Sequence, residues 1–425
     1  MSNKMNDVIV VGGGVVGCWT ALHLAQAGCK VTLLERDSIG RGASYGNCGY
    51  VSPSHVHPLS GPGAIKHALE MMVRSGGALS VPPRWDPSLW RWLMRFRKHC
   101  SGKAFEQGSR ARHALLRSAR ALYTDFAEQH ADSLQWRTAG LMMVYRSPDR
   151  FEAYASAAEQ LQRDFGLQIN RYDGDNVSEV EPALQSGLAG GWHFPDDAHL
   201  HPGQLMQQLR KQLDACGVEV RESCGVDRFV MGAGGLSQIH SDSGESFSAD
   251  GFVIAAGAET SRFAKSLGCK IPVVPGKGFS VTIHGAASRP TIPMIFEDDH
   301  VAVTPLDGAL RIGSTMQFVG YDRSVPEHRI ELLKRSAKLH LRDPIHAAGE
   351  AGQEQEERWS GWRPMSPDGI PIISRLPKAR NVCLATGNGM IGIACGPATA
   401  KLAAELMLDQ TPHVDPEPYR VERFN

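Results

Sequence analysis

The sequence predicts an α/β fold in which a Rossmann-like dinucleotide-binding domain is joined to a second, α+β domain with an antiparallel sheet. Three observations predict it. At 425 residues the chain is longer than one ordinary hydrophobic core supports, so two domains are expected. Residues 8–35 read as a strand, a glycine turn, a helix and a second strand. From residue 272 to residue 317 the pattern changes to successive short strands.

The N-terminal unit carries the motif Gly12-x-Gly14-x-x-Gly17 directly after an apolar strand. Gly12 permits the tight turn, Gly14 lets a pyrophosphate approach the backbone, and Gly17 lets the helix pack closely on the sheet. The N-terminus of the helix offers free N–H groups to the phosphates. Glu35, at the end of the second strand, has the position of a carboxylate that accepts a hydrogen bond from a ribose hydroxyl. The unit therefore predicts a bound dinucleotide.

Composition excludes several classes of protein. The chain has 45 basic and 45 acidic residues, so its net charge of +0 gives no support for binding nucleic acid. Nine scattered cysteines without a CxxC pair indicate a reducing compartment and neither a disulfide framework nor a zinc site. The N-terminal residues lack the apolar segment of a signal peptide, and no apolar run is long enough to span a membrane. We expect a cytoplasmic protein, with contact at the inner face of the membrane left open.

A loop rich in small and turn-forming residues follows the second strand, over residues 40–49. It comes where a long cofactor would continue past the first helix, and its hydroxyl, amide and N–H groups are able to hold the second half of that cofactor. The alternative is a plain surface loop.

Residues 89–98 combine apolar and basic side chains at helical spacing. One interpretation is an interfacial helix that contacts an anionic membrane surface. The other, which we prefer, is a core-packed helix with a solvated basic face. Beyond it the pattern predicts a helix over 110–130, a strand over 140–145 and a helix over 151–165.

The middle of the chain alternates between strands and helices. His199 and His201 lie in a stretch rich in Gly, Pro, His and Asp, and two histidines without Glu or Cys at ligand spacing do not predict a metal site. The remaining elements expected here are a helix over 205–215, a strand over 218–222, a hairpin of 226–231 with 236–240, a strand over 251–258 that ends on Ala-Ala-Gly, strands over 278–283, 300–304 and 310–315, and a helix over 327–342.

The C-terminal part repeats the strand, glycine turn and helix order. Residues 361–371, with three prolines and two glycines, are not expected to form regular structure. A strand over 382–386, a glycine turn over 387–392 and a helix over 394–407 then follow. This unit would direct a second positive helix end at a cofactor.

Four features in one order carry a family resemblance: GGGVVG with Glu35-Arg36, Ala43-Ser44-x-x-Asn47-x-Gly49, VIAAGAET, and GWRPMSPDGIPII with ATGNGMIGIACGPATAKLAAELM. Together they resemble the FAD-dependent D-amino acid oxidase/dehydrogenase family, and within it the bacterial D-amino acid dehydrogenase branch of the small-subunit type. The resemblance covers essentially the whole chain. The N-terminal motif is shared by many dinucleotide-binding proteins, whereas the C-terminal motifs are far more specific.

The resemblance implies extended FAD in a discontinuous domain formed by residues 1–54, 198–271 and 357–425, with residues 55–197 and 272–356 as the substrate domain. It implies cofactor-binding roles for Gly12, Gly14, Val15, Val16, Gly17, Glu35, Arg36, Ser44, Asn47, Gly49, Val226, Ala256, Gly257, Gly389, Met390, Ile391 and Gly392. Some relatives have a basic residue where this chain has Met390. The cysteine motif of relatives with covalent flavin is not found, so non-covalent FAD is expected, with no metal.

Arg363 matches the arginine of the family's GxRP motif, which pairs with the substrate carboxylate. A planar, permanently charged guanidinium suits bidentate binding of a carboxylate. The alternative is a structural arginine that caps a loop. Arg311 and Lys277 are weaker candidates for the substrate site.

The activity that the resemblance implies is oxidative deamination in amino acid catabolism. Hydride would pass from the α carbon of a D-amino acid to flavin N5, giving an imino acid and then a keto acid, while the cofactor carries the difficult chemistry. Alternatives are dehydrogenation of cyclic D-imino acids such as D-proline or D-hydroxyproline, a glycine or sarcosine-type oxidase, and a flavin-binding subunit whose catalytic partner lies elsewhere. A respiratory quinone is the expected electron acceptor. Side-chain preference and oligomeric state stay open.

Overall fold

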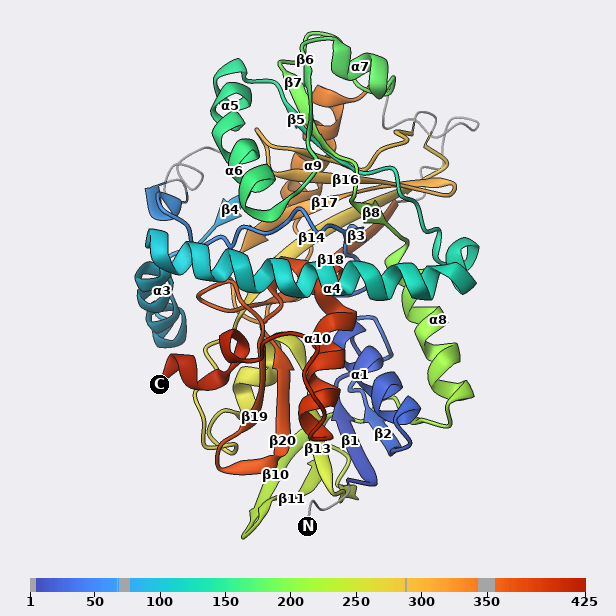
Figure 1. Cartoon of the computed structure of the whole chain (residues 1–425), viewed down its shortest axis with the longest axis vertical. Coiled ribbons are helices and arrows are strands. Elements are labelled where there is room, and N and C mark those ends of the chain that lie inside the picture. The colour runs from blue at the N-terminus through green and yellow to red at the C-terminus, as the bar shows by residue number, and fades with distance from the viewer. Residues whose placement is uncertain (1–4, 67, 69–76, 287–288, 343–355) are drawn as a thin grey trace.

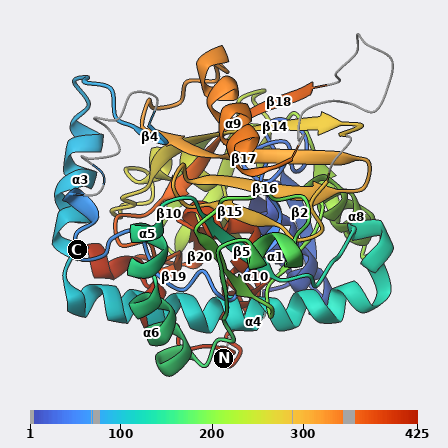
Figure 2. The ribbon, with the colours of Figure 1, turned by 90° about the horizontal axis from the view of Figure 1, so that it is seen from above.

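The computed structural model describes residues 5–66, 68, 77–286, 289–342 and 356–425 (Figure 1). Two large sheets lie at opposite ends of the longest axis of the molecule, and the long helix α4 (Gly102–Leu134) crosses between them (Figure 1). Seen from above, α4 runs along one side of the molecule (Figure 2). The predicted α/β class, with parallel and antiparallel sheets, is confirmed.

The first sheet has six strands in the order β19-β20-β13-β1-β2-β9, all parallel to their neighbours except β19. The strands are β1 (Asp7–Val11), β2 (Lys30–Leu34), β9 (Glu219–Arg221), β13 (Gly251–Ile254), β19 (Ile372–Leu376) and β20 (Ala379–Thr386). They read as nearly continuous apolar runs because both faces are covered. Helices α1 (Val15–Gln26), α8 (Pro202–Ala215) and α10 (Gly392–Met407) cover one face. A three-stranded sheet of β10 (Val226–Gly232), β11 (Gly235–Ser241) and β12 (Ser246–Phe247) packs on the other.

The second sheet has nine strands, eight of them in the order β18-β14-β17-β16-β15-β5-β7-β6, with β4 paired to β17. Most pairs are antiparallel. The strands are β4 (Leu79–Ser80), β5 (Leu141–Tyr145), β6 (Asn170–Asp173), β7 (Gly190–Phe194), β14 (Val274–His284), β15 (Met294–Phe296), β16 (Val301–Leu306), β17 (Ala309–Gln317) and β18 (Glu356–Met365). Helix α9 (Glu327–His340) packs on one face, and α5 (Pro148–Ala153), α6 (Ala155–Phe165) and α7 (Asn176–Val180) pack near β5–β7.

Helix α3 (Pro87–His99) begins at Asp86, whose carboxylate accepts hydrogen bonds from the N–H groups of Ser88 and Leu89. The preferred core-packed interpretation is confirmed for Leu89 and Trp92, which are buried. Trp90 and Met94, by contrast, are exposed, because the helix contacts the protein through the opposite stripe. The indole N–H of Trp92 donates to the carbonyl of Met365 at 2.9 Å, so α3 is tied to the end of β18.

The expectation that residues 361–371 would be irregular is wrong for their first half. Residues 361–365 belong to β18, which pairs along β14 from Glu356 to Met365, with Pro364 opposite Pro275. Proline cannot donate to a ladder, but β18 is the edge strand of its sheet, where that loss is tolerated. The division into domains stays a prediction, and β18, although it falls in the predicted segment 357–425 of the first domain, pairs in the second sheet.

Candidate functional site

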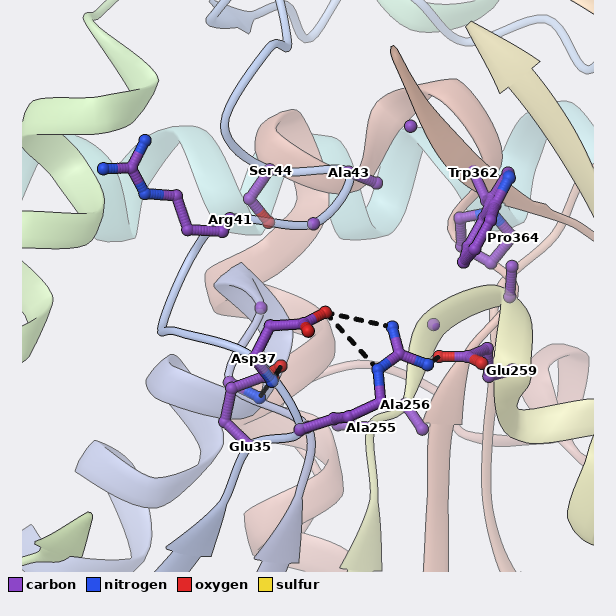
Figure 3. Close-up of a pocket in the computed structure, with 18 of the residues that line it drawn as sticks. Glu35, Asp37, Arg41, Ala43, Ser44, Ala255, Ala256, Glu259, Trp362 and Pro364 are labelled. Carbon is purple, nitrogen blue, oxygen red and sulfur yellow. Dashed lines mark hydrogen bonds and ion pairs between the residues drawn. The ribbon is translucent and has the colours of Figure 1, made fainter. Parts of the chain in front are cut away.

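A cavity of about 570 Å³ opens at the carboxyl ends of the parallel strands and is closed on another side by β18. In parallel α/β sheets ligands bind at this edge. In Figure 3, Ser44 of the 40–49 loop lies across the cavity from Ala256, and Trp362 and Pro364 lie to one side. The volume falls in the range of roughly 300–1,000 Å³ that is typical of cofactor and small-molecule sites.

Most of the residues singled out from the sequence line this cavity. They are Gly12, Gly14, Val15, Val16, Glu35, Arg36, Ser44, Asn47, Val226, Ala256, Gly257, Gly389, Gly392 and Arg363. Six others are not part of its lining: Gly17, Gly49, Met390, Ile391, Arg311 and Lys277. The functional roles of all of them stay predictions.

The glycine turn brings α1 close to the strands. A Cβ atom at Gly12, whose φ is +107°, would lie 2.5 Å from the carbonyl oxygen of Ala255. A Cβ atom at Gly17 would lie 1.8 Å from the carbonyl oxygen of Gly12. Gly17 therefore serves helix packing, as the motif predicts for its third glycine. Gly49 is similar, because a Cβ atom there would lie 2.0 Å from the carbonyl oxygen of Leu200.

Two helices, α1 and α10, begin at the cavity. Neither has an acidic residue in its first turn, and in neither does the side chain of the cap residue accept a hydrogen bond from a backbone N–H. Helices α3, α4, α5 and α8 each have such a capping bond. The first N–H groups of a helix need acceptors and carry partial positive charge. The two N-termini therefore offer donors to an anionic ligand, although Ser44 Oγ accepts one of them, the N–H of Val15, at 3.0 Å.

The glycines of the cavity wall leave room for that ligand. A Cβ atom at Gly14 would come no closer than 3.6 Å to Ser44 Oγ, and one at Gly42 would meet nothing within 4 Å. A Cβ atom at Gly392 would be 3.9 Å from the Cβ atom of Asn388. Protein packing does not require glycine at these three positions, so the open space in front of them fits an extended dinucleotide.

Glu35 is fixed at the end of β2 by two backbone donors. Its Oε2 atom accepts from the N–H of Gly13 at 2.6 Å, and its Oε1 atom accepts from the N–H of Asp37 at 2.9 Å. Burial raises the pKa of the Glu35 carboxyl, and the two backbone hydrogen bonds partly offset this rise because they stabilise the charged form. Arg36 forms ion pairs with Glu259 and, at 3.2 Å, with Asp37 at the rim of the cavity. Each Glu35 oxygen retains acceptor capacity for a ribose hydroxyl.

Arg311 holds the 40–49 loop and is not exposed to the cavity. It is buried on β17, where its Nη1 atom donates to the carbonyls of Tyr45 at 2.9 Å and Asn47 at 3.1 Å. Its Nε atom donates to Thr282 Oγ1 at 2.9 Å. The sequence placed this arginine on a strand but gave no sign that its partners would be carbonyls of a distant loop.

Lys277 is also buried away from the cavity, on β14. Its ammonium pairs with Asp322 at 2.5 Å and donates to Ser324 Oγ at 3.3 Å. It therefore anchors the segment between β17 and α9. Among the described residues no group of three or more His, Cys, Asp or Glu side chains could hold a metal ion.

Arg363 lines the cavity from β18. Its Nη1 atom donates to the carbonyl of Thr315 at 2.7 Å, and its Nη2 atom donates to the carbonyl of Ser314 at 3.3 Å. Within the described part of the chain no carboxylate pairs with this guanidinium, and burial lowers its pKa. It is a half-buried cation that lines the cavity without a carboxylate partner of its own in the described part of the chain, so it is available to pair with a negatively charged ligand.

Sequence reasoning missed other cavity-lining residues: Gly13, Asp37, Arg41, Gly42, Asp227, Asp242, Glu259, Arg262, Arg323, Arg358, Trp359 and Trp362. Asp37 and Glu259 adjoin motif residues and could have been found from them. Arg323 follows no motif, and only the pairing of the second sheet brings its segment to the cavity.

Comparison with known proteins gives a consistent result. A family model described as DAO, FAD dependent oxidoreductase, matches residues 7–406. The D-amino acid dehydrogenase of Paramagnetospirillum magneticum is 28% identical over 424 residues, which cover 98% of each chain. D-amino acid dehydrogenase 1 of Mesorhizobium japonicum is 29% identical over 98% of this chain and 99% of its own.

Solved structures share the fold at lower identity. Glycine oxidase from Geobacillus kaustophilus superposes with a TM-score of 0.78 at 22% identity over 99% of both chains. L-proline dehydrogenase from P. horikoshii gives a TM-score of 0.74 at 18% identity over 99% of this chain and 98% of that one. At this level of identity the likeness establishes the architecture alone.

The open space at Gly14 yields a prediction. We expect Gly14→Ala to weaken flavin binding about tenfold, equivalent to about 1.4 kcal/mol, because the methyl group would occupy the path of the pyrophosphate. The stability of the flavin-free protein should not change, since the new Cβ meets Ser44 Oγ at an ordinary 3.6 Å. Flavin absorbance per protein and urea unfolding measure the two effects. Gly102→Ala, at the start of α4 with nothing within 4 Å, is the control, and full flavin content in Gly14→Ala would contradict the prediction.

Proposed function

The chain belongs to the DAO family of FAD-dependent oxidoreductases, and from this premise we propose that it is a D-amino acid dehydrogenase. It would oxidise the Cα–N bond of a D-amino acid to an imino acid, which water hydrolyses to a keto acid and ammonia. The observation that carries the proposal is Arg363, a half-buried cation at the cavity wall with two carbonyl partners and no carboxylate partner among the described residues. The choice of the D enantiomer as substrate is supported by relatives that match over their full length and are named D-amino acid dehydrogenase.

The cofactor would lie along the six-stranded sheet. Gly12, Gly14 and the N-terminus of α1 would bind the pyrophosphate, Glu35 the adenosine ribose, and Val226 the adenine. Gly389 and Gly392, at the start of α10, would face the flavin. When bound, FAD supplies the two-electron oxidation of the substrate.

Non-covalent attachment is part of the proposal. Among the described residues that line the cavity, Cys224 is the one cysteine, and no histidine is present. Cys224 lies close to Val226, toward the proposed adenine end, and burial raises the pKa of its thiol. A protonated thiol at that end is not suited to bond with the flavin.

Arg363 would bind the substrate carboxylate. Two of the five guanidinium N–H donors are used by the carbonyls of Ser314 and Thr315, so the others remain for a ligand. A carboxylate takes two such donors in a bidentate, charge-assisted pair. The cavity residues next to Arg363 in sequence, Trp362 and Pro364, have no titratable side chain, so this part of β18 would provide a carboxylate anchor without an adjacent side-chain base.

The electron acceptor and its location extend the proposal. Among the described residues no helix is long and apolar enough to cross a bilayer. Three apolar side chains are nevertheless exposed here: Trp85, just before α3, is 91% exposed, and Trp90 and Met94 on α3 are 55% and 60% exposed. The basic residues Arg91, Arg97 and Lys98 are exposed on the same helix. Helix α3 has no acidic residue. We call this the α3 surface and propose that it contacts the anionic inner face of the membrane, where a respiratory quinone would accept the electrons.

A panel of amino acids tests the activity. We expect D-alanine and other primary D-amino acids to bleach the flavin absorbance under anaerobic conditions, because the family chemistry moves two electrons from substrate to FAD. The L-enantiomers serve as controls. D-proline tests the cyclic imino acid alternative, and glycine tests the glycine oxidase alternative. If either is oxidised faster than every primary D-amino acid, the corresponding alternative is favoured over the proposal. If no amino acid of the panel bleaches the flavin, the proposal is refuted.

Arg363→Ala tests the carboxylate anchor. We expect KM for the best D-amino acid to rise at least about tenfold, since a charge-assisted pair contributes roughly 1.5–3 kcal/mol. The flavin should stay bound, because the proposed FAD contacts lie on the six-stranded sheet and its helices, the 40–49 loop and β10, and none lies on β18. Arg358→Ala is the matched control, as it lies on the same strand and lines the cavity but pairs with Glu327 and Glu356. An unchanged KM in Arg363→Ala would remove this residue from the substrate site.

The α3 surface is tested by vesicle sedimentation. The triple variant Trp85→Ala, Trp90→Ala and Met94→Ala should bind anionic vesicles at least about tenfold more weakly, because burying each large apolar side chain contributes roughly 1.5–3 kcal/mol. Turnover with an artificial soluble acceptor should be retained. Met231→Ala, which removes an exposed methionine on β10, is the control. Equal sedimentation of the triple variant and the parent protein would show that another surface makes the contact.

A further inference from the structure

Arg363 reaches its partners by crossing a strand. The sheet order is β18-β14-β17, so β14 lies between the strand that carries Arg363 and the strand that carries Ser314 and Thr315. The guanidinium nevertheless donates to the carbonyls of both residues. The side chain therefore passes over the backbone of β14 to reach β17.

Gly278 of β14 provides the space for this crossing. A Cβ atom at Gly278 would lie 2.4 Å from both Cζ and Nη2 of Arg363, and 2.8 Å from Nη1. These contacts involve Cζ and both terminal nitrogens, so the charged end of Arg363 lies against the bare backbone of this glycine. Any other residue at position 278 would have to displace the charged end of Arg363.

The two acceptors on β17 result from an irregularity in the sheet. Lys277 pairs with Gln317 and Phe279 pairs with Ser314, so two residues of β17 lie opposite the single residue Gly278. This is a β-bulge, a feature that redirects backbone and side-chain groups near functional sites. In a regular ladder the carbonyls of β17 would point at neighbouring strands, whereas here two consecutive carbonyls point at a side chain.

The bulge is strained. Ser314 has φ of +101° and Thr315 has φ of +42°, values that side-chain-bearing residues rarely adopt. Thr315 is β-branched and buried, and its hydroxyl has no hydrogen-bond partner in the described part of the chain. Its side chain therefore offers no local compensation for the strain. What this conformation does achieve is the contact between the two carbonyls and Arg363, and backbone strain that persists without local compensation is typical of functional sites.

We propose that Gly278 and the strained residues at the bulge, Ser314 and Thr315, are positioning residues that fix the guanidinium of Arg363 for the substrate carboxylate. The carbonyls hold one side of the guanidinium and Gly278 supports its face, so the remaining N–H donors face the cavity in one orientation. This inference rests on the proposed function of Arg363. It adds that the arginine must also be held in one orientation to align the substrate, because a carboxylate displaced by about 1 Å would misalign the Cα–H bond that reacts.

The test is Gly278→Ala in the flavin-loaded full-length protein. We expect KM for D-alanine to rise at least tenfold and the dissociation constant of propionate, read from the perturbed flavin spectrum, to rise by the same factor. Propionate has the carboxylate without the amine, so it reports binding independently of turnover. Flavin content and the melting temperature should stay at the parent values. Unchanged KM and propionate affinity in a folded, flavin-loaded Gly278→Ala would overturn the inference.

Gly276→Ala is the matched control, because it adds a methyl group to the same strand against the flexible side chains of Met365 and Met316. An equal rise in KM for Gly276→Ala would mean that any disturbance of β14 acts alike, which would count against a specific role for Gly278. If Gly278→Ala fails to fold, Arg363→Lys is the second variant. Lysine keeps the positive charge but lacks the planar fork that the two carbonyls orient, so KM for D-alanine and the propionate dissociation constant should each rise at least about tenfold. Values within about twofold of the parent protein would overturn the inference, because charge alone would then suffice.

Arg363→Ala separates this inference from the proposed function. If Gly278 acts through Arg363, Gly278→Ala should not lower kcat/KM further in the Arg363→Ala background. A full additional loss in the double variant would refute positioning while leaving Arg363 as the anchor. If Arg363→Ala alone left KM unchanged, the proposed function would fail first.

Discussion

The site depends on the close approach of α1 to the parallel sheet at Gly12 and Gly17. The carbonyl oxygen of Gly12 occupies the place that a side chain at position 17 would need. This contact directs the N-terminus of α1 at the carboxyl edge of the sheet. It also sets the position of α10, whose Gly396 packs against Val15, since a Cβ atom there would be only 3.2 Å from the Val15 side chain. One helix–strand contact thus brings two positive helix ends to the same cavity.

The two sheets contribute different chemistry to that cavity. The six-stranded sheet provides glycine turns, helix N-termini and Glu35, which together suit a long anionic cofactor. The nine-stranded sheet contributes Arg363 and the aromatic side chains of β18. Arg311 connects the two parts, because it lies in the second sheet and binds carbonyls of the loop that continues from β2. The 40–49 loop, which lines the cavity, is therefore held by the sheet that also carries Arg363.

Sequence reasoning succeeded where the determinants are local. The GxGxxG turn, Glu35 and the glycine turn before α10 are each defined by neighbours in the chain, and they lie at the cavity. It failed where an outcome depends on which strands pair. Residues 361–365 look irregular because of their glycine and proline content, yet the edge position of β18 allows a strand. Likewise, Lys277 and Arg311 have suitable charge for a substrate site, but their partners, Asp322 and the carbonyl of Tyr45, come from segments that only the folded sheet brings near.

The discontinuous strand order of the first sheet has a consequence for biosynthesis. Val8 pairs with Val31 on one side and with Gly251 on the other, and Phe252 pairs with Val382, so one side of the N-terminal strand is covered only by segments made much later. Such non-local pairing costs loop-closure entropy before it gains contacts. When α1 emerges from the ribosome during synthesis, β13, β20 and α10 have not yet been made. The cavity is therefore complete only late in translation, and unpaired apolar strands such as β1 and β2 are prone to aggregation until then.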